Sequence, residues 1–328
     1  MTVVRLVAQG MTDKTWKSLV TAITGDSSIS ESLSNSGGDY SVVSNQVYVY
    51  DRFLDTFVAV ENRFVTGREV DERLENWEVV KERYAIEQND RILYRANLLV
   101  AKYGGTASLI GCGVLDEGRK FFAVIQTGHI DVPLMTNGVD RINSYIVIIT
   151  SHDGSIPICY YNLDSLERNG TTYRVPASKE SEFSLRKRHT PSDTDLNQEV
   201  LEAMHMRREW SAHLSTTIKR LFTPIGLHLE AEILEEFWPI KFASTDKKRE
   251  HAEGVHDLIR SLRAKDDAIT GYGRYGISLL NAINNYIDFH RKIPDHEAAQ
   301  HALEVDNYSH RLKLKVTERL LATNGVQT

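Results

Sequence analysis

The chain has 328 residues, 41% of them hydrophobic, and 39 Lys and Arg stand against 45 Asp and Glu, for a formal net charge of −6. A chain of this length can bury one large core or two smaller ones. The acidic balance argues against a protein that binds nucleic acid or a membrane through its overall charge, although it leaves room for a local basic groove.

The cysteine content and the apolar runs favour a cytoplasmic location. Cys112 and Cys159 both fall inside predicted strands, so we do not expect a disulfide framework. The first ten residues lack a basic segment followed by a long apolar one, which argues against a signal peptide. The longest apolar run, residues 145–149, is too short to span a bilayer. We therefore expect a cytoplasmic protein without a membrane partner.

An acidic lead-in is expected at residues 1–75, where 11 Asp and Glu stand against 7 Lys and Arg. Within it, the Ser- and Gly-rich segment 27–38 predicts a loop. Two short alternating segments, 40–43 and 46–50, predict strands. The charged residues 69–76 are expected to be exposed.

A helix is predicted after a short strand at 77–81. Asn89 and Asp90 are both good N-caps, and the Gly104-Gly105 pair is typical of a helix C-terminus. Apolar residues recur at helical spacing between these ends and should face the core. Three basic residues are predicted on the opposite side of the helix: Arg91, Arg95 and Lys102.

Four strands are predicted to follow as an antiparallel meander. Their ranges are 106–115, 119–127, 142–151 and 156–162. Asp116-Glu117-Gly118 and His152-Asp153-Gly154-Ser155 predict two hairpin turns, because Gly tolerates the positive φ that such turns need.

The remainder is predicted to be mostly helical. After an alternating strand at 183–189, Ser192 and Asp195 have capping-box spacing before a long helix that Pro224 stops. Further helices are predicted at 227–237, 246–264, 277–289 and 297–321. The expected fold class is α+β: a central antiparallel β-meander with packed helices, followed by a helical C-terminal domain. The predicted domain ranges are 1–75, 76–225 and 226–328.

Five motifs in order strengthen this interpretation: GDYSV at 38–42, VVKERYAIEQN at 79–89, TSHDGS at 150–155, LRKRHT at 185–190 and TGYGRYGISLLNAINNYIDFH at 270–290. Together, over about residues 37 to 291, they resemble the phage/plasmid-like proteins of domain-of-unknown-function family nine hundred and thirty-two. A Trp often precedes the Asn-Ala segment in that family, whereas Tyr272 and Tyr275 lie there in this chain. The resemblance implies a cytoplasmic protein of phage or plasmid origin, and it carries over no catalytic residues because the family has no established activity.

A second resemblance concerns the order of elements. A helix that ends in Lys-Tyr-Gly-Gly, then a β-meander and a long helix, is similar to the core of phage and eukaryotic single-strand annealing proteins. That resemblance implies binding of unwound DNA along a basic groove without a nucleotide, and assembly into rings or filaments.

The main candidate site is a basic strip on the predicted strand at 183–189, on the long helix after it and on the outer side of the earlier helix. Such a strip could contact the phosphates of single-stranded DNA, with Tyr94 or Tyr103 stacking on bases. Its basic residues are Arg186, Lys187, Arg188, Arg207, Arg208, Lys219, Arg220, Arg91, Arg95 and Lys102. The alternative is a solvated amphipathic face, because residues 181–225 hold 7 Lys and Arg against 6 Asp and Glu.

Enzyme-like patterns lack the context that their chemistry needs. Ser151, His152 and Asp153 are adjacent and cannot form a hydrolase triad, whose base meets its nucleophile across space. The Gly-rich segment 271–276 follows a predicted helix rather than a strand, so it predicts a helix connector and not a dinucleotide site. The histidines lack metal-site spacing, and no Walker sequence occurs. We expect no catalytic residues, no metal and no cofactor.

The sequence therefore predicts a non-enzymatic, phage-type protein that binds and anneals single-stranded DNA in recombination or replication and forms a homo-oligomer. The alternative is a phage accessory protein that binds a host or phage protein without nucleic acid.

Overall fold

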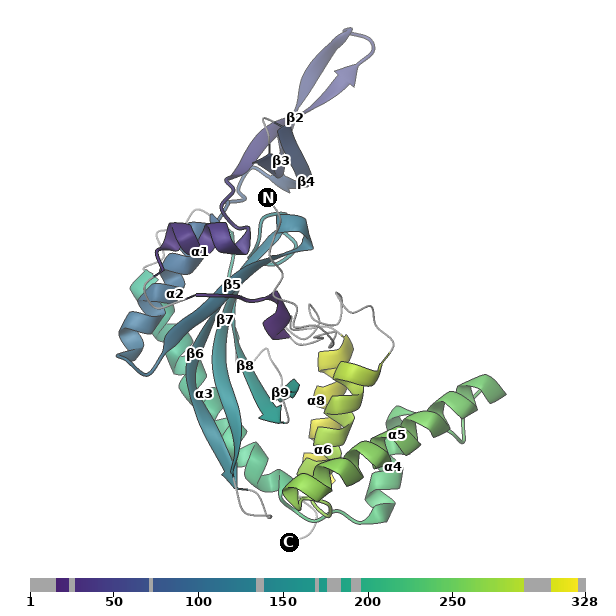
Figure 1. Cartoon of the computed structure of the whole chain (residues 1–328). Helices are drawn as coiled ribbons and strands as arrows, with labels where there is room; N and C mark the ends of the chain where they lie inside the picture. Colours follow the sequence, from purple (N-terminus) through teal and green to yellow (C-terminus); the bar gives the residue numbers. More distant parts are fainter. Residues whose placement is uncertain are drawn as a thin grey trace.

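The computed structural model describes residues 16–23, 27–70, 73–133, 139–168, 171–175, 184–189, 196–291 and 308–323. Its centre is a seven-stranded antiparallel sheet in the order β1-β5-β6-β7-β8-β10, with β9 also paired to β8 (Figure 1). The strands are β1 Thr21–Ala22, β5 Ser108–Leu115, β6 Lys120–Pro133, β7 Val139–Ser151, β8 Ile158–Arg168, β9 Thr171–Val175 and β10 Ser184–Lys187.

The predicted meander is confirmed, because β5 to β8 are consecutive neighbours in the sheet. Both predicted hairpin turns are present. Glu117 and Gly118 adopt left-handed backbone conformations with φ of 57° and 93°, and Gly154 has φ of 76°. Strands β6 and β8 run several residues beyond their predicted ends, and β1 and β9 were not predicted.

Both faces of the central sheet are buried, which explains why its strands consist of nearly continuous runs of apolar residues. One face packs against the helices α1 (Ile29–Ser36), α2 (Asn89–Tyr103) and α3 (Leu196–Leu221), and it includes Phe121, Ile125, Ile146, Ile148 and Tyr160. The opposite face forms a second cluster with Phe122, Val124, Val147, Tyr161 and Leu163.

The first two helices begin and end with recognisable local signals. Helix α1 (Ile29–Ser36) starts after Ser28, whose side chain accepts the Glu31 amide, and it ends at Gly37 in the left-handed conformation. The loop predicted at 27–38 is therefore wrong, because its Ser and Gly residues cap a short helix. Helix α2 (Asn89–Tyr103) ends at Gly104 as predicted, but its N-cap is Gln88, so the N-cap prediction is wrong by a residue.

Helix α3 (Leu196–Leu221) joins the two main cores of the protein. Its first half packs Val200 and Ala203 against the sheet. Its second half packs Trp210, Leu214 and Ile218 into a separate C-terminal core. At 1.5 Å per residue, its 26 residues span about 39 Å, enough to reach both. The capping-box residues predicted before this helix lie outside the described residues.

The C-terminal region is helical, as predicted, and the end of the central sheet adds Val132, Ile142 and Leu166 to its core. It contains α4 (Leu227–Phe237), α5 (Asp246–Thr270), α6 (Gly276–Asn285), one π-helical turn at Tyr286–His290, and α8 (Tyr308–Thr323). The bounds of α4 match the prediction, whereas α5 continues to Gly271, where a left-handed cap ends it. The Gly-rich segment 271–276 connects α5 to α6, as expected for a helix connector. The first residues predicted for the last helix lie outside the described residues.

A buried ion pair fixes α3 to the sheet. Both nitrogens of the Arg207 fork donate to the Asp164 carboxylate, at 2.9 and 3.2 Å. The indole of Trp210 and the hydroxyl of Ser144, at 2.7 Å, also donate to this carboxylate. Arg207 is 3% exposed and Asp164 is 2% exposed. Four donors satisfy a charge that would be costly to bury alone.

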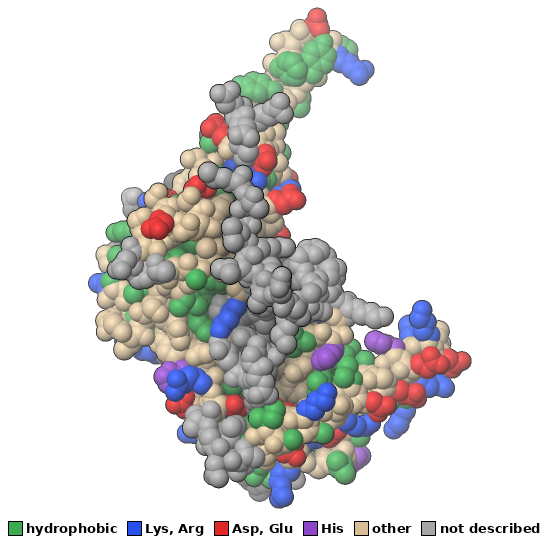
Figure 2. Space-filling view, viewed as in Figure 1, with side chains coloured by type: hydrophobic (Ala, Val, Ile, Leu, Met, Phe, Trp, Pro, Cys, Tyr) green, Lys and Arg blue, Asp and Glu red, His purple; other side chains and the backbone are tan. Residues whose placement is uncertain are grey.

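A separate three-stranded sheet projects from the body, in the order β2-β3-β4 (Figure 1). Its strands are β2 Val42–Asp51, β3 Thr56–Val70 and β4 Arg73–Lys81. The β2–β3 ribbon extends furthest, and apolar side chains gather near its end (Figure 2). The predicted boundary between residues 75 and 76 falls inside β4, and the one between 225 and 226 falls between α3 and α4.

We expect Arg207→Met to lower the free energy of unfolding by about 3–5 kcal/mol, because it leaves the buried Asp164 carboxylate without its counter-charge. Arg208→Met is the matched control, since Arg208 is the next residue of α3 and is exposed. It should change stability by no more than about 0.5 kcal/mol. Urea unfolding of both variants measures the difference, and equal losses would contradict a structural role for the ion pair.

Candidate functional site

The predicted basic strip is largely exposed and is carried by α2, α3 and β10. Seven members of the strip have exposed side chains, and they lie in α2, in α3, in β10 or just after β10. They are Arg91, Lys102, Arg186, Arg188, Arg208, Lys219 and Arg220. Lys187 is half-buried and pairs with Glu202 of α3 at 2.9 Å. Arg220 also donates to the carbonyl oxygen of Leu321 at 2.8 Å.

The three elements form one surface. Helices α2 and α3 pack side by side and run in the same direction, since Arg95 contacts Glu199 near their starts and Tyr103 lies near Arg207 and Arg208 further along. Arg208 and Lys219 are separated by about 16 Å along α3, at the helical rise of 1.5 Å per residue. The surface is not purely basic, because Glu202 and Glu209 of α3 are also present. We refer to the exposed side of α2, α3 and β10 as the outer surface.

Two arginines of the predicted strip are not on this surface. Arg95 is 7% exposed, and its guanidinium lies 3.1 Å from Glu87 and 2.5 Å from Glu199. Its predicted position on the outer side of α2 is wrong. The sheet and α3 both cover α2, and together they bury a wider arc of this helix than its apolar stripe. Arg207 faces the sheet and binds Asp164, so its predicted position is also wrong.

Tyr103 is only partly available for stacking on a base. Its ring packs against the core under α2, and its hydroxyl is buried. Burial raises the pKa of Tyr103, and the nearby charges of Arg207 and Arg208 oppose that rise. Tyr94, by contrast, is 50% exposed on α2. Of the two tyrosines proposed to stack on bases, Tyr94 has the more accessible ring.

A buried polar junction lies where the projecting sheet meets the body. The Asn89 amide nitrogen donates to the Gly38 carbonyl at 2.8 Å, and its amide oxygen lies 2.8 Å from Nε2 of His152. Because a carbonyl can only accept, the Asn89 oxygen must face the imidazole. Nε2 of His152 therefore carries the proton, and Nδ1 has a bare lone pair. This Nδ1 is buried without a hydrogen-bond partner in the described part of the chain.

Aromatic rings surround the His152 imidazole. It stacks on Trp77 of β4 with ring centres 5.7 Å apart, and it meets Tyr40 edge-on at 6.3 Å. Tyr40 donates to the Gly118 carbonyl at 2.5 Å, and the Arg68 guanidinium lies over its ring at 5.2 Å. Contacts to β3, to β4 and to the β5–β6 turn therefore meet at this junction.

A second histidine completes the junction on the other side of the 150–155 turn. His189 packs against Tyr84 at 4.8 Å, and its Nδ1 lies 3.2 Å from the Ala85 carbonyl. The Tyr84 hydroxyl donates to the Ser151 carbonyl at 2.7 Å. Four motifs that are far apart in the sequence, at 38–42, 79–89, 150–155 and 185–190, thus contact one another here.

In the described junction, Oγ1 of Thr150 lies 3.3 Å from Nε2 of His189, whereas Ser151 and His152 bond to other partners. The hydroxyl of Ser151 donates to the Ile156 carbonyl at 2.8 Å, and the His152 imidazole faces Asn89 instead. The expectation that Ser151, His152 and Asp153 do not form a hydrolase triad is confirmed. Several side chains here donate hydrogen bonds to backbone carbonyls, which is typical of a structural junction.

Burial changes the protonation of both histidines in the junction. Removal from water lowers the pKa of His152 to about 4, and the nearby His189 adds to this effect, while Asp153 opposes it. Burial also lowers the pKa of His189, although its two backbone partners counteract the shift. The His152 imidazole is therefore neutral near pH 7.

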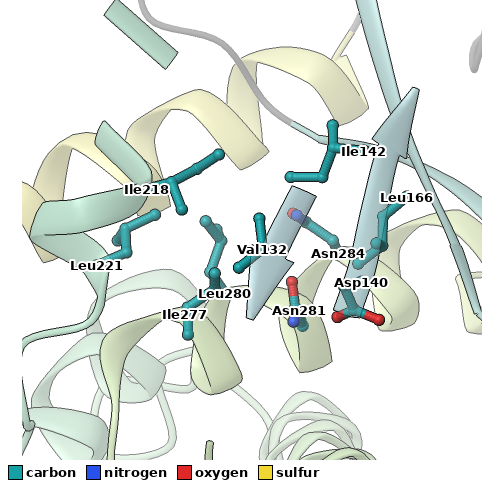
Figure 3. Close-up of a pocket in the computed structure, with 10 residues that line it drawn as sticks. All are labelled: Val132, Asp140, Ile142, Leu166, Ile218, Leu221, Ile277, Leu280, Asn281 and Asn284. Atoms are coloured by element: carbon teal, nitrogen blue, oxygen red, sulfur yellow. The ribbon is translucent and has the colours of Figure 1, made fainter. Parts of the chain in front are cut away.

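A small pocket lies between the end of the sheet, α3 and α6. It is lined by Val132, Ile142, Leu166, Ile218, Leu221, Ile277 and Leu280 together with three polar residues (Figure 3). The polar residues are Asp140, Asn281 and Asn284, whose side chains lie close to one another in Figure 3. Its volume of about 20 Å³ suits a water molecule and is too small for a nucleobase.

The described ranges contain no group of three or more His, Cys, Asp or Glu side chains that could hold a metal ion. Among the helices that the structure describes, none combines the length and the apolar character needed to cross a membrane. Cys112 and Cys159 are both buried and form no disulfide.

Comparison with protein families identifies residues 76–313 as a Domain of unknown function (DUF932). This match covers more than half of the 328 residues. The chain belongs to the DUF932 family. No similar protein was found among curated sequences, and no similar fold among solved structures.

The DUF932 match begins just before Trp77 and therefore contains α2, the central meander, α3 and most of the C-terminal helices. It includes the outer surface and most of the junction. Strands β2 and β3 lie before the matched range.

Sequence reasoning missed the buried charges of the DUF932 region, although a signal was present. Arg207 is four residues after Ala203 and three before Trp210, which places it within the apolar stripe of α3. Glu199 is four residues before Ala203 and follows the same spacing. A charge at a stripe position indicates a buried partner, and the partners Asp164 and Arg95 come from distant segments.

We expect the stability of this protein to fall between about pH 6.5 and pH 4 through His152. The folded state holds His152 neutral, with a pKa of about 4, whereas the unfolded chain takes up a proton near 6.5. Its stabilising contribution is therefore complete above pH 6.5 and is lost as the pH falls, by about 3 kcal/mol in total. His189 should act in the same direction.

Urea unfolding at several pH values, compared between the wild type and His152→Gln, tests this dependence. The variant should lose part of the pH slope between 6.5 and 4. His228→Gln is the control, because the His228 side chain on α4 is 91% exposed. Parallel pH profiles for wild type and His152→Gln would contradict the expected role.

Proposed function

We propose that this DUF932 protein binds single-stranded DNA on the outer surface of α2, α3 and β10 and promotes annealing without catalysis. We place it in the cytoplasm of a phage-infected or plasmid-bearing bacterium, where it acts in recombination or replication as a homo-oligomer.

The observation that supports the proposal is the exposure of seven basic side chains on three adjoining elements. The 16 Å between Arg208 and Lys219 corresponds to about five phosphates at the 3.4 Å spacing of one DNA strand. Arg186 and Arg188 extend the surface beyond the start of α3. A strand with this spacing could therefore contact several of these side chains at once.

Annealing on such a surface needs no reacting group. Basic side chains hold the phosphates, the bases remain turned outward, and the exposed Tyr94 ring offers a stacking platform. Neutralisation of the strand lowers the repulsion between two phosphate backbones, which helps a complementary strand to pair. No nucleotide hydrolysis enters this scheme.

A second candidate function is an accessory protein that binds a host or phage protein without nucleic acid. It is favoured by the pairing of Lys187 with Glu202 and by the presence of Glu209 on α3, which reduce the positive charge of the outer surface. The formal net charge of −6 has the same effect at longer range.

Fluorescence anisotropy with a labelled single-stranded oligonucleotide, at several salt concentrations, separates the two. For about five phosphate contacts, the slope of log K against log salt should be near −3.5. Arg208→Ala combined with Lys219→Ala removes two contacts and should make the slope less negative by about 1.4.

The matched control combines Lys247→Ala with Lys265→Ala, which removes the same charge from exposed positions of α5. It should leave the slope unchanged. Absence of binding at low salt would reject the DNA-binding proposal in favour of the accessory protein. Equal effects of the two double variants would show that DNA is bound elsewhere.

A further inference from the structure

The projecting β2–β3 ribbon exposes an unusual concentration of large apolar side chains. Figure 2 shows them gathered near its end, beside a few charged groups. Phe53 is fully exposed at the turn, and Phe57 is 69% exposed. The exposed set within residues 48–58 is Tyr48, Val49, Tyr50, Phe53, Leu54, Phe57 and Val58.

Hydrogen bonds and ring contacts within the ribbon, rather than contacts with the body of the protein, hold its outer end in place. The amides of Phe53 and Leu54 both donate to the Asp51 carboxylate, at 2.8 and 3.2 Å. Tyr50 donates to Asp55 and meets Phe57 edge-on at 5.5 Å. A preformed apolar surface of this kind loses little conformational entropy when it binds.

The exposed apolar area is large for a protein that acts alone. A fully exposed aromatic side chain presents about 200 Å², so the set on the ribbon exposes roughly 800 Å². The largest apolar patch on a typical monomer is about 300–600 Å². About 800 Å² is also the area that each partner buries in a standard protein interface. This area is divided between the two faces of the ribbon, because the Val49–Val58 pair lies between the Tyr48–Ala59 and Tyr50–Phe57 pairs and faces the opposite way.

Strand β2 also has an open edge. It pairs with β3 on one side, and no strand of the described residues pairs with its other side. Gln88 bonds the amide and the carbonyl of Val42 at the base of this edge, and the edge continues outward from there to Asp51. Edge strands in monomers are commonly protected by Lys or Pro, and β2 contains neither.

We propose that β2 pairs with β2 of a second copy of this chain, antiparallel and across a two-fold axis, to form a six-stranded sheet. A two-fold interface uses the same patch twice, and an edge strand meets this condition, since its unpaired donors and acceptors complement those of an antiparallel copy. Tyr48 pairs with Ala59 and Tyr50 with Phe57 across the ribbon, so their side chains share one face, which would continue into the second copy.

The charges of the ribbon fit a second copy better than a nucleic acid or an anionic membrane. Residues 42–58 contain Asp51, Arg52 and Asp55, a net charge of −1. Phosphate groups would be repelled by this balance. In an antiparallel pair centred near the middle of β2, the two copies of Asp51 lie at opposite ends, so neither like charges nor unpaired charges are buried.

The mass in solution, measured by analytical ultracentrifugation without DNA over a range of concentrations, tests the inference. The wild type should be a dimer that dissociates on dilution. Tyr48→Lys combined with Val49→Lys places like charges across the pairing edge and should leave a monomer. Leu227→Lys combined with Phe242→Lys is the control, because both residues are 84% exposed apolar side chains outside the ribbon, and it should remain dimeric.

Disulfide trapping tests the geometry and does not depend on the double variant. Single changes Val47→Cys, Tyr48→Cys, Val49→Cys and Tyr50→Cys should give cross-linked dimers at one or two adjacent positions, because a disulfide needs Cα atoms within about 7 Å. The native cysteines are buried and should not react. Leu227→Cys is the control and should remain monomeric on oxidation.

A wild type that is monomeric at tens of micromolar, or a dimer that persists in the ribbon variant without ribbon cross-links, would overturn the inference. A monomer would leave the ribbon as a surface for a different protein or a lipid. The inference does not rest on DNA binding. A monomer that still binds the oligonucleotide overturns this inference and the homo-oligomer of the proposed function, but not the DNA-binding surface. A dimer that fails to bind overturns only the proposed DNA binding.

Discussion

Two buried carboxylates, each paired with a buried arginine, hold the architecture of this protein together. Glu199 accepts hydrogen bonds from Arg95 of α2 and from Tyr160 of β8. Asp164 of β8 accepts from Arg207 of α3 and from its neighbours. These contacts set the position of α3 against both α2 and the sheet. Since α3 also carries the apolar residues of the C-terminal core, the placement of that core depends on the same contacts.

The junction around Asn89 and His152 is the second constraint. It joins the base of the projecting sheet to the start of α2 and to the two turns of the meander. Asn89 donates to the Gly38 carbonyl and turns its amide oxygen to Nε2 of His152, which restricts the imidazole to one tautomer. The motifs that resemble the DUF932 family converge on this junction, so in this chain they serve to join elements rather than to form a reaction centre.

The outer surface and the ribbon are separate features with different chemistry. The outer surface belongs to the DUF932 region and presents basic side chains on rigid helices. The ribbon precedes that region and presents aromatic side chains with a net charge near zero. A dimer formed through the ribbon would bring two outer surfaces into one assembly. Such an arrangement would raise the effective concentration of the two proposed DNA-binding surfaces along a strand.

Much of the secondary structure follows from the sequence by itself. The meander, the bounds of α4, and the end of α2 at Gly104 depend on alternation, helical spacing and glycine conformation, which are properties of neighbouring residues. The same local reasoning fails for the helix α1, where serines and a glycine that are typical of loops act as caps.

Only the tertiary structure decided which charges are exposed. Periodicity places Arg91 and Arg95 on similar sides of α2, yet Arg95 is buried because α3 covers it and supplies Glu199 from more than a hundred residues away. His152 is adjacent to a turn in sequence, but its burial depends on Trp77, Tyr40 and Asn89. The composition and order of the residues thus determined the elements and the available charges. The packing of distant elements determined which of those charges support the fold and which remain to bind a partner, because burial is a property of neighbours in space.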